Sequence, residues 1–321
     1  MRLWSARVTG FRRGQGLSFR AHLSNPGLAV YTQLLAIIGP IVLIAGIGFF
    51  WARNVSGFRS DFVRELVFYL GGPCLVISSL TGSELSAASL LAMGRNAVII
   101  AALCAMIFAL LIRLQGRDLR VLLPPMVFSN SGNMGLPLSL FAFGETGLVL
   151  GVAYFVAMTV LHFTFGIVLV SGQFDLLALL RSPFVLAVMF SAAMLGLEWE
   201  LPALIDNTIR LLGQMTIPLM LLTLGVSLAS LKIRDLVTAV VYGGLRVVVG
   251  FAIGLALVLL LDLRGAERGV LLIQAAMPSA VFTYLMAEHY ERSPETVAGV
   301  IVMSTLIAFV CLPFVVWLAT A

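Results

Sequence analysis

Two short segments of the sequence combine amide and hydroxyl side chains with residues that interrupt helices. The first, residues 124–137, holds three prolines, two glycines and two asparagines. The second, residues 275–282, holds Pro278 and Ser279, and Thr283 follows it directly. Proline removes a helical hydrogen bond, whereas glycine and asparagine tolerate non-helical backbone. Freed N–H groups beside amides and hydroxyls suit the binding of a small anion.

The composition places these segments inside a lipid bilayer. Of 321 residues, 60% are hydrophobic and 11% are charged, with a mean hydropathy of +1.07. Soluble domains carry about 25% charged residues. The apolar surface therefore exceeds what one core can hide, which excludes an ordinary cytosolic enzyme and predicts an integral membrane protein.

Ten apolar stretches are long enough to cross a membrane as helices, and long β-alternation is absent. They lie at approximately 32–52, 62–81, 96–113, 118–142, 146–171, 182–197, 208–231, 235–261, 267–289 and 295–318. The fold class predicted from these stretches is an all-α membrane protein with ten transmembrane helices.

The two helix-breaking segments lie in the fourth and ninth stretches, about 145 residues apart. Pro73 and Pro218 are separated by the same offset. Ten helices divide into five plus five, and an odd number per half makes the second half cross the membrane in the opposite sense. Backbone that is not helical is tolerated at membrane depth where it lines a cavity walled by protein. We therefore expect two inverted five-helix repeats, with a binding site at the broken helices 4 and 9.

Positive charge in the loops predicts the orientation. Ten Lys and Arg residues follow odd-numbered stretches (Arg53, Arg59, Arg64, Arg113, Arg117, Arg120, Arg181, Lys232, Arg234, Arg292), and four follow even-numbered ones (Arg95, Arg210, Arg264, Arg268). Short cytoplasmic loops are enriched in Lys and Arg, which places both termini outside the cytoplasm in a multi-pass protein of the cell (inner) membrane. Residues 1–30 carry five further arginines, which would bring the count to ten against nine.

The sequence gives little support for disulfides, a metal site, nucleic-acid binding or enzyme activity. Cys74, Cys104 and Cys311 lie singly in apolar stretches, so neither a disulfide framework nor a metal site is expected. The arginines are scattered between spans, which argues against nucleic acid as a partner. The chain has no nucleotide-binding loop and no GxSxG or HExxH pattern, so we expect no enzyme activity and no cofactor.

Several of these motifs resemble the auxin efflux carrier family. The run from Asn130 to Leu138, followed by Phe143-Gly144, is similar to the family's fourth helix. Residues 276–280 with Ser304-Thr305 resemble its ninth and tenth helices, and residues 216–219 with 225–228 resemble its seventh. The resemblance covers about residue 33 to the C-terminus. It leaves residues 1–30 as a basic arm outside the match, 31–171 as the first repeat and 172–321 as the second.

The resemblance implies that helices 4 and 9 cross at the substrate site and that a transport domain moves like an elevator against a scaffold. Bacterial relatives of this type are thought to carry small organic acids such as malonate or malate, and plant relatives export auxin. The partners implied are a small organic acid, the lipid bilayer and a second copy in a homodimer. The candidate substrate-binding residues are Asn130, Ser131, Gly132, Asn133, Gly135, Pro137, Met277, Pro278, Ser279 and Thr283.

Three ionisable residues are candidates for charge compensation or coupling. Arg246 stands deep in the eighth span, where it either offsets substrate charge or serves as a structural residue. His162 either takes up a proton during transport or forms a structural hydrogen bond. Glu288 lies near the end of the ninth span, where it either couples protonation or belongs to an interfacial loop. Methionines and phenylalanines elsewhere are expected to face lipid or packed helices.

Two alternatives stay open at this point. A sodium-coupled symporter of the bile-acid type shares the crossed-helix plan and needs oxygen ligands beside the crossing, which Asn130, Ser131, Ser279 and Thr283 could supply. A membrane-embedded enzyme is the other alternative. The sequence leaves both proton and sodium coupling open.

Overall fold

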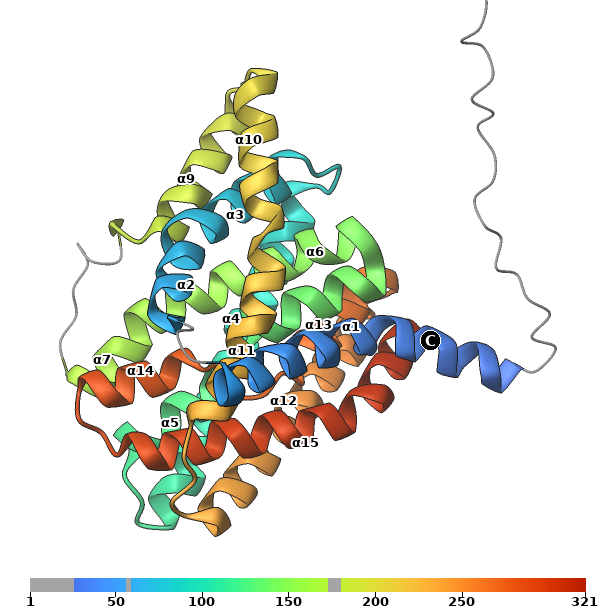
Figure 1. Ribbon diagram of the computed structural model, residues 1–321. Helices are drawn as coiled ribbons and strands as arrows, with labels where there is room; N and C mark the ends of the chain where they lie inside the picture. The colour runs from blue at the N-terminus through green and yellow to red at the C-terminus, as the bar shows by residue number, and fades with distance from the viewer. Residues whose placement is uncertain (1–25, 56–58, 173–179) are drawn as a thin grey trace, which may run out of the picture.

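The computed structural model describes residues 26–55, 59–172 and 180–321, which are helical except for short connections (Figure 1). Within those ranges the only extended pairing is one isolated β-bridge. An all-helical chain is thus confirmed for the described residues. Of the predicted basic arm, residues 1–25 lie outside them. Residues 26–30 belong to the first helix.

The helices follow one another with short connections. They are α1 (Pro26–Asn54), α2 (Ser60–Leu66), η1 (Val67–Gly71), α3 (Gly72–Thr81), α4 (Ala87–Leu114), α5 (Leu119–Val127), η2 (Ser131–Gly135), α6 (Leu136–Leu161), η3 (His162–Gly166), α7 (Ile167–Ser171), α9 (Pro183–Gly196), α10 (Ala203–Gln214), α11 (Thr216–Ser230), α12 (Leu236–Leu260), α13 (Gly265–Ala275), α14 (Phe282–His289) and α15 (Pro294–Thr320). The three η elements are π-helical turns that run directly into the next helix.

Polar residues set where several helices begin. The side chains of Ser86, Asp118 and Asp235 accept hydrogen bonds from backbone N–H groups in the first turns of α4, α5 and α12. These N–H groups have no acceptor within their own helix, so an oxygen at the preceding residue stabilises the helix start.

Seven helical segments of the described residues are long and apolar enough to cross a membrane. They are Val30–Asn54, Asp61–Thr81, Ala87–Leu114, Ser131–Ser171, Ala203–Ser230, Leu236–Leu260 and Pro294–Thr320. The number is lower than the ten predicted stretches for three reasons. Helix α9 has 14 residues, the fourth and ninth stretches are broken into shorter helices, and Ser131–Ser171 spans two predicted stretches.

The 41-residue segment Ser131–Ser171 turns sharply at Gly144. This residue has φ 62° and ψ −151°, a conformation that is open to glycine because it lacks Cβ. The turn falls in the interval predicted to separate the fourth and fifth stretches.

The helices pack in two groups. In the first, which we call the α1/α11 group, α1 lies along α11, α3 packs between α9 and α10, and α2 and η1 adjoin α11 and α3. In the second, the α12/α15 group, α12 lies along α15, and α6 packs against α4 and α13. This group also includes α5 beside α4, η2 and η3 beside α6, and α14 beside α15. In Figure 1, α3, α9 and α10 gather at the top, and α5, α12 and α15 lie toward the bottom.

Glycines bring α1 and α11 into backbone contact. A Cβ atom at Gly48 would overlap the backbone of Leu222, and one at Gly225 would overlap the carbonyl of Ala45. Small residues at such positions let apolar helices approach closely, which stabilises their packing through dispersion forces.

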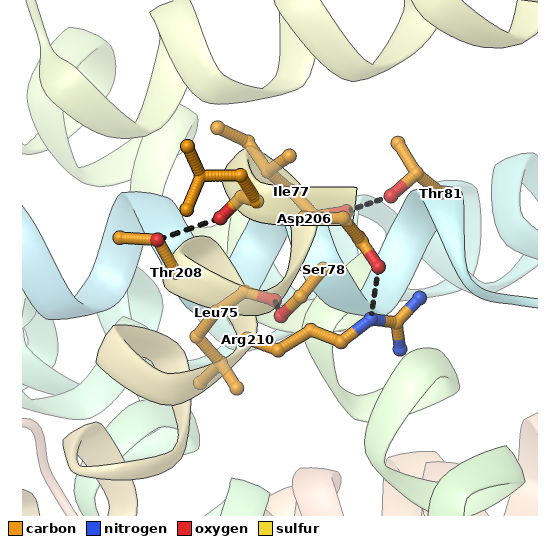
Figure 2. A network of polar contacts seen from close by, with 8 residues as sticks. Leu75, Ile77, Ser78, Thr81, Asp206, Thr208 and Arg210 are labelled. Atoms are coloured by element: carbon orange, nitrogen blue, oxygen red, sulfur yellow. Dashed lines mark hydrogen bonds and ion pairs between the residues drawn. The ribbon is translucent and has the colours of Figure 1, made fainter. Parts of the chain in front are cut away.

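Polar side chains at the contact of α3 and α10 form their hydrogen bonds within their own helix. Figure 2 shows that Thr81 and Ser78 donate to carbonyl oxygens of their own helix, as Thr208 does in α10. Arg210 Nε donates to Asp206 Oδ2 at 2.8 Å on the same helix. A hydroxyl or a cation in an apolar helix needs such a partner to avoid an unmatched polar group.

Candidate functional site

The two predicted interruptions are present, and the broken segments contact each other. Helix α5 ends at Val127 and α13 ends at Ala275, and residues 128–130 and 276–281 are not helical. Ser129 and Ser279 form the isolated antiparallel bridge. The N–H of Asn130 donates to the Pro278 carbonyl at 2.7 Å, and the N–H of Ala280 donates to the Phe128 carbonyl at 2.9 Å. The interrupted backbones therefore satisfy one another at the point where they meet.

The first interruption is shorter than predicted. Gly132, Asn133 and Gly135 lie in the π-helical turn η2, and Pro137 lies in the first turn of α6. They are therefore helical, so the interruption is limited to residues 128–130 of the helix-breaking segment 124–137. Proline is well accommodated at a helix start because the N–H that it lacks has no partner there.

A cavity of about 600 Å³ opens beside this meeting point. Its walls come from both packing groups. The α1/α11 group contributes Asp61, Arg64, Glu65, Val67, Phe68, Tyr69, Phe184, Met220, Thr223 and Ser227, and the α12/α15 group contributes Phe128–Asn133, Phe155, Met158, Thr159, His162, Phe163, Ala280–Phe282 and Leu285. Cavities of this size hold small organic ligands.

Five predicted site residues line the cavity: Asn130, Ser131, Gly132, Asn133 and His162. Asn130 is buried, and its side-chain Nδ2 has no hydrogen-bond partner among the described residues. Its carbonyl accepts from Met134 and Gly135, so the following N–H groups begin a helix that continues to Leu161. The start of a helix carries partial positive charge, which here adjoins an amide donor free to bind a ligand.

The other predicted substrate-binding residues stand behind the cavity. Met277 is fully buried, and Pro278 and Ser279 hold the bridge to residues 129 and 130. The Ser279 N–H donates to Ser304 Oγ at 3.1 Å, and Thr283 Oγ1 donates to the Ala280 carbonyl at 2.7 Å. These contacts shape the crossing rather than the cavity wall.

Gly135 and Pro137 also lie away from the cavity. A Cβ at Gly135 would overlap the side chain of Gln274, so the glycine lets α13 approach η2 closely. Gln274 is fully buried, and its Nε2 donates to Ser139 Oγ at 3.4 Å.

The three ionisable candidates occupy different places. The His162 ring stacks on Phe128 with centroids 4.1 Å apart, and its Nε2 lies 2.9 Å from Met286 Sδ. Glu288 is exposed at the end of α14, where it accepts a hydrogen bond from Tyr284 at 3.0 Å. Arg246 is fully buried in α12, outside the cavity wall.

Aromatic residues form much of the cavity wall, which corrects the expectation that phenylalanines only face lipid or packed helices. Phe155 packs edge-on against Phe184 with centroids 5.2 Å apart, and Phe163 lies 5.9 Å from Phe68. Both pairs join the two packing groups. Sequence periodicity cannot reveal these residues, because an inward-facing phenylalanine has the same spacing as one that faces lipid.

Charged residues at one end of the cavity were also missed. Asp61 and Arg64 form an ion pair on α2, and Glu65 follows them. The Asp61 side chain is 83% exposed, so the cavity extends from buried Asn130 to the surface of the molecule. The excess of charge at the start of α2 was the available signal, but it indicated only the end of a membrane span.

Comparison with known proteins supports the resemblance seen in the sequence. Residues 166–316 match the family described as membrane transport protein. An uncharacterized transporter of Methanocaldococcus jannaschii is 23% identical over 279 residues, which cover 81% of this chain and 90% of the relative.

Two other relatives match shorter stretches. An uncharacterized transporter of Methanothermobacter thermautotrophicus is 29% identical over 195 residues, 57% of this chain and 63% of the relative. Auxin efflux carrier component 8 of Arabidopsis thaliana is 29% identical over 115 residues, 35% of this chain and 31% of the relative. Together with the apolar helices and the paired interruptions, these matches show that the chain is similar to membrane transport proteins and, over part of its length, to auxin efflux carriers.

Proposed function

We propose that the protein is a secondary transporter that carries a small organic anion, a carboxylate, across the cell membrane. The observation that carries the proposal is the Nδ2 of buried Asn130, which has no hydrogen-bond partner among the described residues. It lies beside the helix start at Ser131, on the wall of a cavity of about 600 Å³. Donors without a partner in a buried site favour a ligand with acceptor oxygens.

The remaining cavity wall fits the organic part of such a ligand. Phe68, Phe155, Phe163 and Phe184 supply apolar surface, whereas Asn133 and Thr223 add polar groups on opposite sides. A ligand with one anionic and one apolar end matches this distribution.

We propose ten membrane crossings arranged as two inverted repeats, residues 31–171 and 172–321. The positions of the two interruptions support this arrangement, since α5 and α13 each end in the middle of a predicted span. Pro73 and Pro218 support it as well. Both lie in the first turn of a helix that follows another helix directly, α3 after η1 and α11 after α10.

Transport would proceed by alternating access, with the α12/α15 group moving against the α1/α11 group like an elevator. The cavity between the two groups supports this division, because a ligand held there contacts both. Its exposed end carries Asp61 and Arg64, next to a loop that the distribution of positive charge assigns to the cytoplasm. The structure would then correspond to a state open to the cytoplasm, with the termini on the other side. Location in the bacterial inner membrane and assembly as a homodimer stay predictions.

A sodium-coupled symporter of the bile-acid type is the second candidate function. The Oγ atoms of Ser129 and Ser279 favour it, because both are buried beside the crossing without a hydrogen-bond partner among the described residues, apart from the Tyr154 hydroxyl beside Ser129. Unpaired oxygens at broken helices are the usual ligands of a coupling cation.

The test is uptake of labelled monocarboxylates and dicarboxylates into proteoliposomes that contain the purified protein. Substituting Asn133→Ala should lower uptake by about 10-fold or more, since one hydrogen bond to a charged ligand contributes roughly 1.5–3 kcal/mol. The matched control is Asn207→Ala on the exposed face of α10, which should transport like the unchanged protein. Equal uptake by the two variants would remove the cavity as the substrate site.

A further inference from the structure

Arg246 is a buried cation with few partners. The residue is fully buried in α12, and its Nη1 donates a long hydrogen bond to Cys104 Sγ at 4.0 Å. Within the described parts of the chain, its Nε and Nη2 have no hydrogen-bond acceptor, and none of its nitrogens lies within 4.0 Å of a carboxylate oxygen. The guanidinium stays protonated in proteins. A full positive charge is therefore held inside the membrane protein without a counter-ion from these residues.

The guanidinium lies near the end of α13, and Arg246 is not among the described residues that line the cavity. The space beside Gly250 is occupied by Arg246 Nη1 and by the carbonyl oxygen of Ala275. Ala275 is the last residue of α13, where the second interruption begins. The carboxyl end of a helix carries partial negative charge, so this carbonyl attracts a cation.

Hydroxyl oxygens complete these surroundings. Tyr154 interacts electrostatically with Arg246, and its hydroxyl neighbours Ser129. The Ser279 Oγ is buried and has no hydrogen-bond partner in the described chain, and the adjoining hydroxyls of Ser129 and Tyr154 have none there apart from each other. Ser129 and Ser279 are the two residues of the bridge. One half-helix end and the Tyr154 hydroxyl therefore lie near Arg246, and the hydroxyls of Ser129 and Ser279 lie at the crossing.

Such a set of oxygens suits a cation. In carriers with broken helices, carbonyl groups at half-helix ends and unwound backbone coordinate the coupling sodium ion. A mobile sodium ion would compete for this region with a guanidinium that is covalently attached to α12. Like charges repel strongly where water is excluded, so the two do not occupy it together.

We propose that the guanidinium of Arg246 takes the place of a coupling cation at the crossing. The carrier then moves its anion without sodium, and Arg246 supplies the positive charge that compensates the negative charge of the anion. This inference rests on the proposed function and extends it to the choice of coupling ion. It selects against the sodium-coupled alternative.

The contrast with Arg210 supports the assignment. Arg210 side-chain exposure is 47%, and its charge is paired with Asp206 at 2.8 Å (Figure 2). An arginine placed for helix stability thus has a carboxylate partner and access to water, whereas Arg246 is fully buried and has no carboxylate partner in the parts of the chain that the structure describes.

The test measures sodium binding through thermal stability. The purified protein and the variants Arg246→Ser, Arg246→Lys and Arg210→Ser are unfolded by heat in sodium chloride and in choline chloride of equal ionic strength. Removing the guanidinium opens the oxygen-lined space, so Arg246→Ser should gain a saturable rise in Tm of roughly 2–4 °C in sodium. The unchanged protein, Arg246→Lys and Arg210→Ser should show the same Tm in both salts.

Two results would overturn the proposal. One is a sodium-dependent rise in Tm of the unchanged protein as large as that of Arg246→Ser. The other is a folded Arg246→Ser variant that does not respond to sodium. Neither measurement needs a substrate, so both can be read even if no carboxylate is transported.

Transport by the unchanged protein provides a second measurement that does not depend on the folding of any variant. Uptake into proteoliposomes at equal rates, within about twofold, in sodium and choline media supports the proposal. Uptake that requires sodium contradicts it and leaves the function as a carboxylate carrier standing. If Arg246→Ser does not fold in either salt, this comparison decides the question.

Discussion

At the scale of single residues, the cavity depends on donors without partners and on aromatic packing. Asn130 presents an unpaired amide nitrogen, whereas His162 is enclosed by Phe128, Phe282 and Met286. A carboxylate near His162 would stabilise its protonated form, but none of its described contacts supplies one. The geometry therefore favours a neutral, structural imidazole over the alternative role in proton coupling.

This assignment of His162 predicts the effect of two substitutions. His162→Phe preserves the stacked ring and should keep uptake within about twofold of the unchanged protein at about pH 6 and about pH 8. His162→Ala removes the ring and should lower the free energy of unfolding by roughly 2–4 kcal/mol through the space it leaves. Chemical denaturation of the purified variants measures the second effect.

His289 serves as the control because it is exposed at the end of α14. His289→Ala should change stability by less than about 0.5 kcal/mol. If His162→Phe lost the dependence of uptake on a proton gradient while it remained folded, a proton-coupling role for His162 would be established instead.

At the scale of elements, the contact of α1 with α11 depends on glycines. The helices touch through backbone at Gly48 and Gly225, so a single methyl group has no room there. Gly46 lies on the same helix with no atom within 4 Å of the position of its Cβ. The two positions on α1 therefore respond differently to the same substitution.

Substituting Gly48→Ala should lower the free energy of unfolding by about 1–3 kcal/mol, because the methyl group overlaps the Leu222 backbone and pushes the helices apart. Gly46→Ala should be neutral or stabilise the protein by up to about 1 kcal/mol through helix propensity. Thermal unfolding in detergent compares the two variants directly. Equal losses of stability would show that the close contact does not hold the pair together.

At the scale of the whole molecule, the cavity lies between two groups of helices that meet through aromatic side chains. Phe68 of the α1/α11 group lies 5.9 Å from Phe163 of the other group and 5.4 Å from Phe184 of its own, measured between ring centroids. Relative motion of the groups would separate the first pair and leave the second in place. The two pairs thus distinguish motion between groups from motion within one.

Cross-linking tests this motion. In a protein without Cys74, Cys104 and Cys311, the double variant Phe68→Cys and Phe163→Cys is joined by a short reducible cross-linker. Uptake should fall at least about 10-fold on cross-linking and recover on reduction, since the link prevents alternating access. The cross-linked pair Phe68→Cys and Phe184→Cys should keep the uptake of its reduced form. Transport that continues with the first pair linked would exclude sliding of one group past the other.

The amino-acid sequence alone determined the class of the molecule and the positions where its helices fail. Sixty per cent hydrophobic residues require a membrane-embedded, helical chain, and Pro278 and the residues around Asn130 interrupt their helices because proline lacks an N–H and asparagine tolerates irregular backbone. These are local properties of the chain. The length of the first interruption was predicted less well, because Gly132 and Pro137 are compatible with both a helix start and an unwound segment.

The tertiary structure alone decided what the interruptions face and which residues join them. It places Ser129 against Ser279, turns six phenylalanines from distant segments toward one cavity, and leaves Arg246 with no carboxylate oxygen within 4.0 Å among the described residues. Local pattern does not determine such contacts, because a side chain that faces lipid and one that faces a cavity follow the same helical period. The packing of the helices in space decides which of them faces the cavity.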